Sequence, residues 1–486
     1  MSKKVKKMPV EELLEEALVP EEEHPYEVPR NWVYFNFTSI LDVQGGTQPP
    51  KSEFIDEEQE GYVRLVQIRD FASDKYMTFI PDTPKLRKIE EEDILIARYG
   101  ASIGKILTGL SGAYNVALAK VVFPNGKIYP KYLFWLLKSG HFQIPLMGLS
   151  RSAQSGFNKK DLSYFKMPLP PYKEQIRIAN KVERLLNKID EAKQLIDNAK
   201  EMFELRRASI LNKAFCGELT AKWREDNKST DVNFLIRKLN KKEGSIQIRS
   251  NKNDEKNAIP YKLPDGWKWI RLRDIATFKS GYAFKSNDFV DEGYQLIRMG
   301  NLYKNKLDLG RNPVFLPKTY DQEIVSRYSV EPGEILLTLT GTKYKRDYGY
   351  AIKVQNQDRK LLLNQRILAL KPYELSDYFY YYLQSNTFRD MFFSFETGGV
   401  NQGNVGSTAV ESIYFPLPPL EEGIEIQKKI ETLLEKERAS NDLLDIEEDI
   451  ESMTQSILSK AFRGELGTND PTEESAIELL KDALQD

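Results

Sequence analysis

The chain carries one block of sequence twice, and this repeat limits the folds it can adopt more than any other feature. The first copy opens with Pro-Leu-Pro-Pro at 168–171 and closes with Ser-Ile-Leu-Asn-Lys-Ala-Phe-Cys-Gly-Glu-Leu at 209–219. The second opens with the same four residues at 416–419 and closes with Ser-Ile-Leu-Ser-Lys-Ala-Phe-Arg-Gly-Glu-Leu at 456–466. Self-similarity of this kind indicates two copies of one structural unit.

Each copy predicts a long helix with an apolar coiled-coil seam, because apolar residues recur every seven positions. The predicted seam consists of Val182, Ile189, Ile196, Phe203, Ile210, Ile430, Leu443, Ile450 and Ile457. Further seam residues are predicted three positions on, at Ala192, Ala199, Leu433, Ile446 and Met453. Pro171 and Pro419 suit a first helical turn, and Gly217 and Gly464 suit a helix end. Such long apolar stripes need a partner, so we expect the two helices to pair.

The segments before the two helices also resemble each other. They contain short β-rich runs broken by Gly, Pro and Asn, which predicts α+β domains. The matching pairs are 29–32 with 264–267, 45–46 with 280–281, 63–70 with 294–301, and 93–100 with 334–341. Similar short amphipathic helices are predicted near the N-terminus, near 234–239 and near 476–484. If the two ends of the chain were joined, the halves would be nearly equal, which predicts a circular, pseudo-two-fold arrangement.

The predicted order follows from these matches. It comprises a short helix at 1–25, a globular domain at 26–168, a long helix at 169–217, a linker with a short helix at 218–259, a second globular domain at 260–416, a second long helix at 417–464, and a short C-terminal helix at 465–486.

Composition argues against several protein classes. No stretch approaches the ~20 apolar residues of a membrane span. The lysine-rich N-terminal residues are followed by no apolar run, so we do not expect them to form a signal peptide. The single cysteine, Cys216, fits a reducing cytoplasm, which we take as the expected location. Only two histidines occur, His24 and His141, which argues against a zinc site or a Ser-His-Asp triad. The net charge of −2 argues mildly against nucleic-acid binding, but acidic helices and tails can mask basic faces elsewhere.

Catalytic motifs fail on inspection. Residues 100–106, Gly-Ala-Ser-Ile-Gly-Lys-Ile, lack the spacing and the hydroxyl residue of a P-loop. Pro170-Pro171-Tyr172 resembles an amino-methyltransferase loop, but Leu169 stands where an amide or carboxylate is needed. We therefore expect no catalytic residue, no metal and no cofactor bound by this chain.

Polar loop residues suited to DNA do occur in both globular domains, at predicted loops and strand ends. Arg and Lys can bond guanine, Asn and Gln can bond adenine, and the others can hold phosphates. The candidates are Thr47, Gln48, Lys51, Gln67, Arg69, Arg98, Tyr99, Ser102, Lys105, Arg151, Lys159, Lys160, Lys279, Tyr282, Lys285, Arg298, Asn301, Lys343, Tyr344, Lys345, Arg346, Asn364, Gln365, Arg366, Asn401, Gln402 and Asn404.

This layout resembles the specificity subunit of type I restriction–modification systems. The resemblance is carried by the two Pro-Leu-Pro-Pro openings, by Glu174-Gln175, by the two helix endings and by the turns near 93–104. Gly423 departs from the pattern, because it replaces the glutamine expected opposite Gln175.

Membership would imply two α/β target-recognition domains separated by a pair of long antiparallel coiled-coil helices. Each domain would read one half of an interrupted site in double-stranded DNA, and the helices would set the spacer. Two methyltransferase subunits would bind S-adenosylmethionine and flip an adenine in each half-site. Restriction subunits would use ATP and Mg²⁺, and this chain would catalyse nothing.

Two alternatives stay open at this point. One is a coiled-coil scaffold that binds only proteins and no DNA. The other is a specificity subunit that serves a methyltransferase without any restriction partner.

Overall fold

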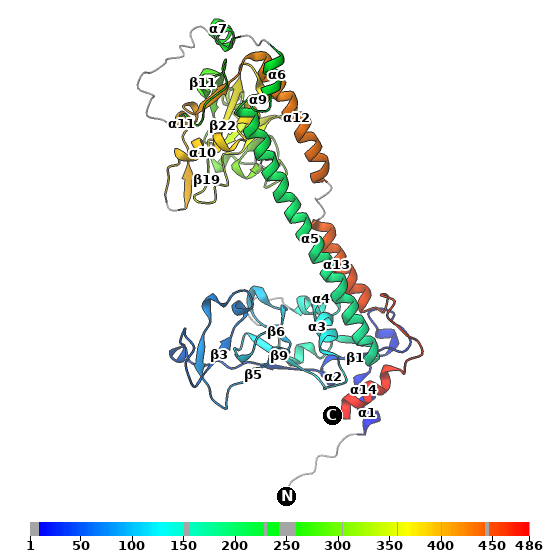
Figure 1. The fold of residues 1–486 in the computed structure, drawn as a ribbon. Helices are drawn as coiled ribbons and strands as arrows, with labels where there is room; N and C mark the ends of the chain where they lie inside the picture. The colour runs from blue at the N-terminus through cyan, green and yellow to red at the C-terminus, as the bar shows by residue number, and fades with distance from the viewer. Residues whose placement is uncertain are drawn as a thin grey trace. The chain divides into compact units, whose positions relative to one another are not determined.

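The computed structural model describes residues 9–149, 156–227, 231–242, 259–303, 305–356, 358–399, 401–442 and 447–485. The predicted site residue Arg151 and the seam residues Leu443 and Ile446 lie outside this part of the chain. The chain divides into two compact units, Met1–Ile196 with Ile446–Asp486, and Asp197–Asp445. Each unit therefore contains one of the predicted globular domains, the start of one long helix and the end of the other (Figure 1).

The first four-stranded sheet has the same strand order in both units. In unit 1 the order is β2 (Asp42–Gly45), β9 (Leu118–Val122), β6 (Leu95–Ala97) and β7 (Ile106–Leu107). In unit 2 it is β12 (Ala276–Ser280), β22 (Ile367–Pro372), β18 (Ile335–Thr338) and β20 (Ala351–Lys353). All neighbours in these sheets are antiparallel. The weak sequence match between the two segments therefore reflects one shared fold.

A second four-stranded sheet repeats in the same way. Its order in unit 1 is β4 (Phe79–Pro81), β3 (Tyr62–Val66), β8 (Gly112–Tyr114) and β5 (Lys88–Ile89). In unit 2 it is β16 (Phe315–Leu316), β13 (Tyr294–Ile297), β21 (Leu361–Leu363) and β17 (Ser329–Val330). The central pair is parallel in both, so these two strands end at the same edge of each sheet.

A strand pair joins each globular domain to its long helix. β1 (Val33–Asn36) pairs with β10 (Lys166–Leu169), and β11 (Lys268–Arg271) pairs with β24 (Tyr414–Leu417). The long helices begin immediately after β10 and β24, so the repeated Pro-Leu-Pro-Pro residues form the junctions between strand and helix.

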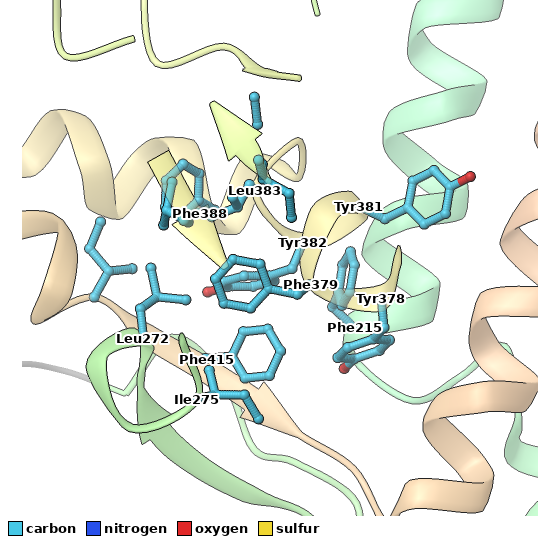
Figure 2. Packing of buried hydrophobic residues seen from close by; sticks show 14 of the residues in the cluster. Phe215, Leu272, Ile275, Tyr378, Phe379, Tyr381, Tyr382, Leu383, Phe388 and Phe415 are labelled. Atoms are coloured by element: carbon cyan, nitrogen blue, oxygen red, sulfur yellow. The ribbon is translucent and has the colours of Figure 1, made fainter. Parts of the chain in front are cut away.

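Aromatic side chains form much of the core beside these junctions. The cores include α3 (Pro130–Lys138) and α4 (Gly140–Leu149) in unit 1, and α9 (Ser376–Tyr382) and α10 (Asn386–Ser394) in unit 2. Figure 2 shows Phe215, from the end of the first long helix, packed beside Tyr378, Tyr382 and Phe415. The hydroxyl of Tyr378 donates to the Pro416 carbonyl at 2.8 Å, and Tyr132 donates to Pro168 at the same distance.

The first long helix is α5 (Tyr172–Phe215), 44 residues long. The second is described as α12 (Leu420–Asp442) and α13 (Glu447–Ala461), on either side of residues 443–446. Val182, Ile196, Ile210 and Ile430 of the predicted seam are buried, while Ile189, Phe203, Ile450 and Ile457 are half-buried.

Some seam positions were predicted wrongly. Ala192 is exposed, Met453 is 55% exposed, and Leu458 and Leu434 are the buried neighbours in the second copy. The physical reason is that a straight helix has 3.6 residues per turn and drifts about 20° per heptad away from a strict seven-residue repeat.

In each unit a buried glutamate at the start of a long helix accepts hydrogen bonds from side chains of two other chain segments. We call this arrangement the carboxylate latch. In unit 2, Glu422 of the first turns of α12 accepts hydrogen bonds from Trp267 Nε1 at 2.8 Å and from Thr220 Oγ1 at 2.7 Å. Arg224, from the short helix α6 (Ala221–Asp226), pairs with the same carboxylate. The latch ties the start of α12 to the tail that follows α5 and to the entry of the globular domain.

Unit 1 repeats this latch with one change. Glu174 of α5 accepts from Trp32 Nε1 and Asn469 Nδ2, both at 2.8 Å, and from Thr468 Oγ1 at 3.2 Å. The nearby arginine, Arg177, pairs with Glu473 instead of with the latch carboxylate. Burial raises the pKa of Glu174, and the three hydrogen bonds oppose that rise.

The glycine at 423 is explained by local packing. Gln175 is fully buried and its Oε1 accepts from the Tyr129 backbone N–H, just before α3. In unit 2 the residue before α9 is Leu375, whose side chain would lie 2.7 Å from a Cβ at position 423. Leu375 therefore occupies the space that a side chain at 423 would need.

Short helices complete both units. α1 (Val10–Ala17) packs against α14 (Ala476–Gln485) in unit 1 (Figure 1), and α7 (Val232–Lys242) places Val232 and Leu235 in the core of unit 2. The two ends of the chain thus meet in one unit, as the circular arrangement predicts.

Thr220→Val tests the latch of unit 2. It keeps the shape of the side chain but removes the buried donor to Glu422, and bonds to charged groups contribute about 1.5–3 kcal/mol. We expect a loss of about 2 kcal/mol in the free energy of opening of unit 2, measured by amide hydrogen exchange. Thr277→Val, at an exposed strand position, is the control and should change it by less than about 0.5 kcal/mol. Equal effects of the two substitutions would show that the latch is not stabilising.

Because His141 is buried in unit 1, we expect the stability of that unit, and not of unit 2, to fall in acid through this residue. Burial, with a smaller effect of Arg463, lowers the pKa of His141 to about 4, and its ring packs between Tyr26 and Phe462. A lowered pKa means that the folded state prefers the neutral ring. The contribution to stability is therefore present above pH ~6.5 and is lost as the pH falls toward 4, by up to about 3 kcal/mol. His141→Phe should remove that part of the pH dependence of unfolding. An unchanged pH profile in the variant would contradict the assignment.

Candidate nucleic-acid interface

Five predicted site residues meet in one hollow of unit 2. They lie on two turns, Arg298 and Asn301 after β13 and Asn364, Gln365 and Arg366 after β21. β13 and β21 are parallel neighbours, so both turns lie at the same sheet edge. The hollow has a volume of about 440 Å³, and Arg311 and Asn312 complete its polar lining.

The hollow is rich in unpaired positive charge. The side chains of Arg298, Arg311 and Arg366 are exposed, and no carboxylate among the described residues pairs with any of them. Phe289 and Met299 add an apolar wall. Guanidinium groups present planar donors that suit base edges and phosphates, so this surface is suited to a nucleic acid.

Asn301 has a structural role in this hollow. It is 3% exposed, its Oδ1 accepts from the Arg298 N–H at 2.9 Å, and its Nδ2 donates to the Asp308 and Arg311 carbonyls. Its side chain therefore shapes the turn that carries Arg298 and leaves no free group for a ligand.

A second basic cluster lies at the paired strands β19 (Thr340–Thr342) and β23 (Gln402–Asn404). Lys343, Tyr344, Lys345 and Arg346 follow β19 directly, and Thr342 pairs with Gln402, which brings Gln402 beside them. Tyr344 is 81% exposed at φ 71°, and Arg346 has φ 49°. Arg389 Nη2 donates to the Arg346 carbonyl at 2.9 Å and so supports this turn.

The two turns that line the hollow of unit 2 have the same backbone hydrogen bonds in unit 1. Gln67 N–H bonds to Asp70 at 2.8 Å, as Arg298 N–H bonds to Asn301. The turn that starts at Asn115 closes with a bond from Leu118 N–H to its carbonyl, as the turn at Asn364 closes with Ile367. Gln67, Val116 and Ala117 therefore occupy the places of Arg298, Gln365 and Arg366.

Several other predicted residues of unit 1 already have partners within the fold. Arg98 donates through Nε and Nη2 to the Phe157 carbonyl at 3.2 and 3.1 Å, and its guanidinium lies 5.2 Å from the centre of the Tyr99 ring. Lys159 pairs with Asp42 at 2.9 Å. Arg69 Nη2 donates to Thr78 Oγ1 at 3.2 Å, so these cations have partners within the fold.

One predicted residue has its charge paired inside the fold. Lys279 lies one residue before the end of β12, where Nζ pairs with Glu334 at 2.8 Å and donates to the Ser329 carbonyl at 2.7 Å. The remaining candidates are exposed or half-buried; Asn401 and Asn404 lie at or beside β23, and the others lie outside the two clusters. They are Thr47, Gln48, Lys51, Ser102, Lys105, Lys160, Tyr282, Lys285, Asn401 and Asn404.

Arg311, Asn312 and Asn115 were missed by the sequence analysis. Asn115 could have been found, because the repeat aligns it with Asn364. Arg311 and Asn312 follow no strand or repeat signal in the sequence. No cluster of three or more His, Cys, Asp or Glu side chains able to hold a metal was found in the described ranges. In the same ranges, no helix is both long and apolar enough to cross a bilayer.

Comparisons with known proteins agree with this geometry. A family model described as the type I restriction modification DNA specificity domain matches residues 29–201 and again 264–450. The MjaVIII type I restriction enzyme specificity subunit of Methanocaldococcus jannaschii is 26% identical over 92% of this chain and 95% of its own. The EcoAI specificity subunit of Escherichia coli is 24% identical over 86% and 80%.

A solved structure gives the same result for the fold. It comes from work on complex assembly and conformational transition of a type I restriction–modification system, and matches 91% of this chain and 100% of its own at 18% identity, with a TM-score of 0.62. Since the family model covers most of the chain in two separate matches, each spanning one globular domain and much of its long helix, the chain belongs to the family of type I restriction–modification DNA specificity subunits.

Proposed function

We propose that this chain is the sequence-specific DNA-recognition subunit of a type I restriction–modification complex. Each globular domain reads one half of an interrupted site in double-stranded DNA. The chain supplies recognition and no catalytic group. The expected cytoplasmic location remains a prediction.

The observation that carries this proposal is the pair of matched turns. Two copies of one backbone present different side chains at the same sheet edge, Gln67 and Ala117 in one unit and Arg298 and Arg366 in the other. A duplicated enzyme would need its reactive groups kept in at least one copy, whereas two readers of different sequences need their exposed side chains to differ. The unpaired guanidinium groups of unit 2 supply donors that DNA can accept.

Partner subunits would supply the chemistry. Two methyltransferase subunits would carry S-adenosylmethionine, and restriction subunits would carry ATP and Mg²⁺. Supporting a protein partner, Leu195, Met202 and Leu205 of α5 are 69%, 65% and 61% exposed. Their spacing places them on one helix face beside the buried seam, and an exposed apolar stripe of this kind fits a docking surface.

A coiled-coil scaffold without DNA is less well supported, because it gives the arginine-lined hollow of unit 2 no role. Salt dependence separates the two functions, since phosphate contacts release counterions and protein contacts do not. The proposal also covers a system without a restriction subunit, because recognition by this chain is the same in both cases.

The complex with its methyltransferase should methylate adenines in one bipartite motif. Two sets of defined bases should flank a spacer whose sequence has no effect, because each domain contacts only its own half-site. Mapping modified adenines in genomic DNA exposed to the complex gives the motif directly. A single continuous motif, or modification without any sequence preference, would contradict the proposal.

Leu205→Glu should weaken assembly with the methyltransferase by at least tenfold, because a carboxylate would then be buried in an apolar contact. Sedimentation of the mixed subunits measures the affinity. Asp197→Lys, an exposed change on another face of α5, is the control and should assemble normally. If Leu205→Glu assembles as well as the unmodified chain, the stripe is not the docking surface.

A further inference from the structure

The two copies of the scaffold allow base contacts to be separated from phosphate contacts. Phosphates are the same in every sequence, so residues that hold them can be kept at equivalent places in both units. Residues that read bases must differ if the two half-sites differ. Asn115 and Asn364 are identical at the starts of their turns, whereas the next two residues are Val116-Ala117 in one unit and Gln365-Arg366 in the other.

The backbone of these turns gives no reason for the difference. The Ala117 carbonyl accepts from the Arg98 N–H at 2.8 Å, and the Arg366 carbonyl accepts from the Leu339 N–H at 3.0 Å. The residues that follow β2 and β12 also bond to these turns in the same way. The Gly46 N–H donates to the Leu118 carbonyl, and the Gly281 N–H donates to the Ile367 carbonyl. The change from alanine to arginine therefore lies only in what the turn presents outward.

The side chains of Arg298 and Arg366 make no ion pair with the described residues that would explain an arginine at these positions. Arg298 and Arg366 come from adjacent turns, line the same hollow and are exposed, and the carboxylates of the described chain leave both unpaired. Asn301 fixes the turn that carries Arg298, so the Arg298 guanidinium projects from a rigid backbone. A base-reading side chain needs this combination of a rigid support and a free head group.

We propose that the hollow of unit 2 reads a guanine, with Arg298 or Arg366 donating two hydrogen bonds to O6 and N7 of that base. The assignment rests on the proposed function and makes it more specific: the half-site of unit 2 contains a G·C pair. Guanidinium is the group that matches the two acceptors of guanine in the major groove. The amide of Gln365, which also differs from its counterpart Val116, flanks the same edge and can contact the neighbouring base.

Arg366→Lys and Arg366→Ala test the assignment, with Arg298→Ala as the companion variant. Lysine keeps the charge but loses the paired donors, so a phosphate contact survives it and a guanine contact does not. The assay uses the complex with its methyltransferase and measures methylation rates on duplexes in which each base pair of the motif is exchanged in turn. Lys371→Ala is the charge control, because Lys371 is exposed near the other end of β22, about 15 Å along the strand.

The expected result is a ten- to hundredfold loss of preference for one G·C pair of one half-site in both Arg366 variants or in Arg298→Ala. The other half-site should keep its preference, and Lys371→Ala should match the unmodified complex. The assignment is overturned if Arg366→Ala and Arg298→Ala slow all sequences equally while Arg366→Lys does not, because the arginines then hold phosphates. It is also overturned if no variant has an effect.

The unmodified complex distinguishes failure of this assignment from failure of the proposed function. If it methylates a bipartite motif in which neither half depends on a G·C pair, only the guanine assignment fails. If it shows no bipartite motif, the proposed function fails and the assignment fails with it.

Discussion

Two buried carboxylates hold this architecture together. Glu174 and Glu422 each lie in the first turn of a long helix. Glu174 accepts hydrogen bonds from Trp32 and from Thr468, which follows the second long helix. Glu422 accepts them from Trp267 and from Thr220, which follows the first long helix. Burying a carboxylate is unfavourable unless its oxygens are bonded, and here both oxygens of each group have partners. Because three distant segments meet at one side chain, each latch fixes where the globular domain joins its helix.

The latch also explains why the chain needs both copies. Unit 1 is closed by Thr468 from the last part of the chain, and unit 2 by Thr220 from the tail after α5. Each latch therefore joins the start of one long helix to the tail that follows the other long helix. The pairing of α1 with α14 joins the two ends of the chain in the same way that continuous sequence joins the corresponding parts of unit 2.

Because the two scaffolds are equal, we attribute the proposed difference between the two half-sites to the side chains at the sheet edge. The strand order, the parallel central pair and the turn bonds are the same in both units. What differs is the charge presented there, since Arg298 and Arg366 face the hollow of unit 2 where Gln67 and Ala117 stand in unit 1. A scaffold that tolerates such changes can acquire a new half-site without loss of fold, because exposed turn residues contribute little to stability.

Much of this could be predicted from the sequence, because repetition makes weak signals comparable. The long helices, the tryptophans that precede each globular domain (Trp32 and Trp267) and the aligned turns all follow from matching one half of the sequence with the other. The latch could not be predicted, since Thr220 and Thr468 are ordinary tail residues until the fold places them against a carboxylate. Loop position also failed to separate ligand-facing groups from internal ones, as Lys279 and Asn301 show, because only the folded structure reveals which polar atoms already have partners.

Photo-crosslinking from matched positions tests the central claim most directly. A photoreactive residue at 116 and, in a separate protein, at 365 would occupy equivalent turns of the two units in the assembled complex. Bound to a duplex carrying the methylated motif, each should crosslink to a different half-site, with the spacer unlabelled. Crosslinks from both positions to the same half-site, or from neither position to the motif, would contradict the account.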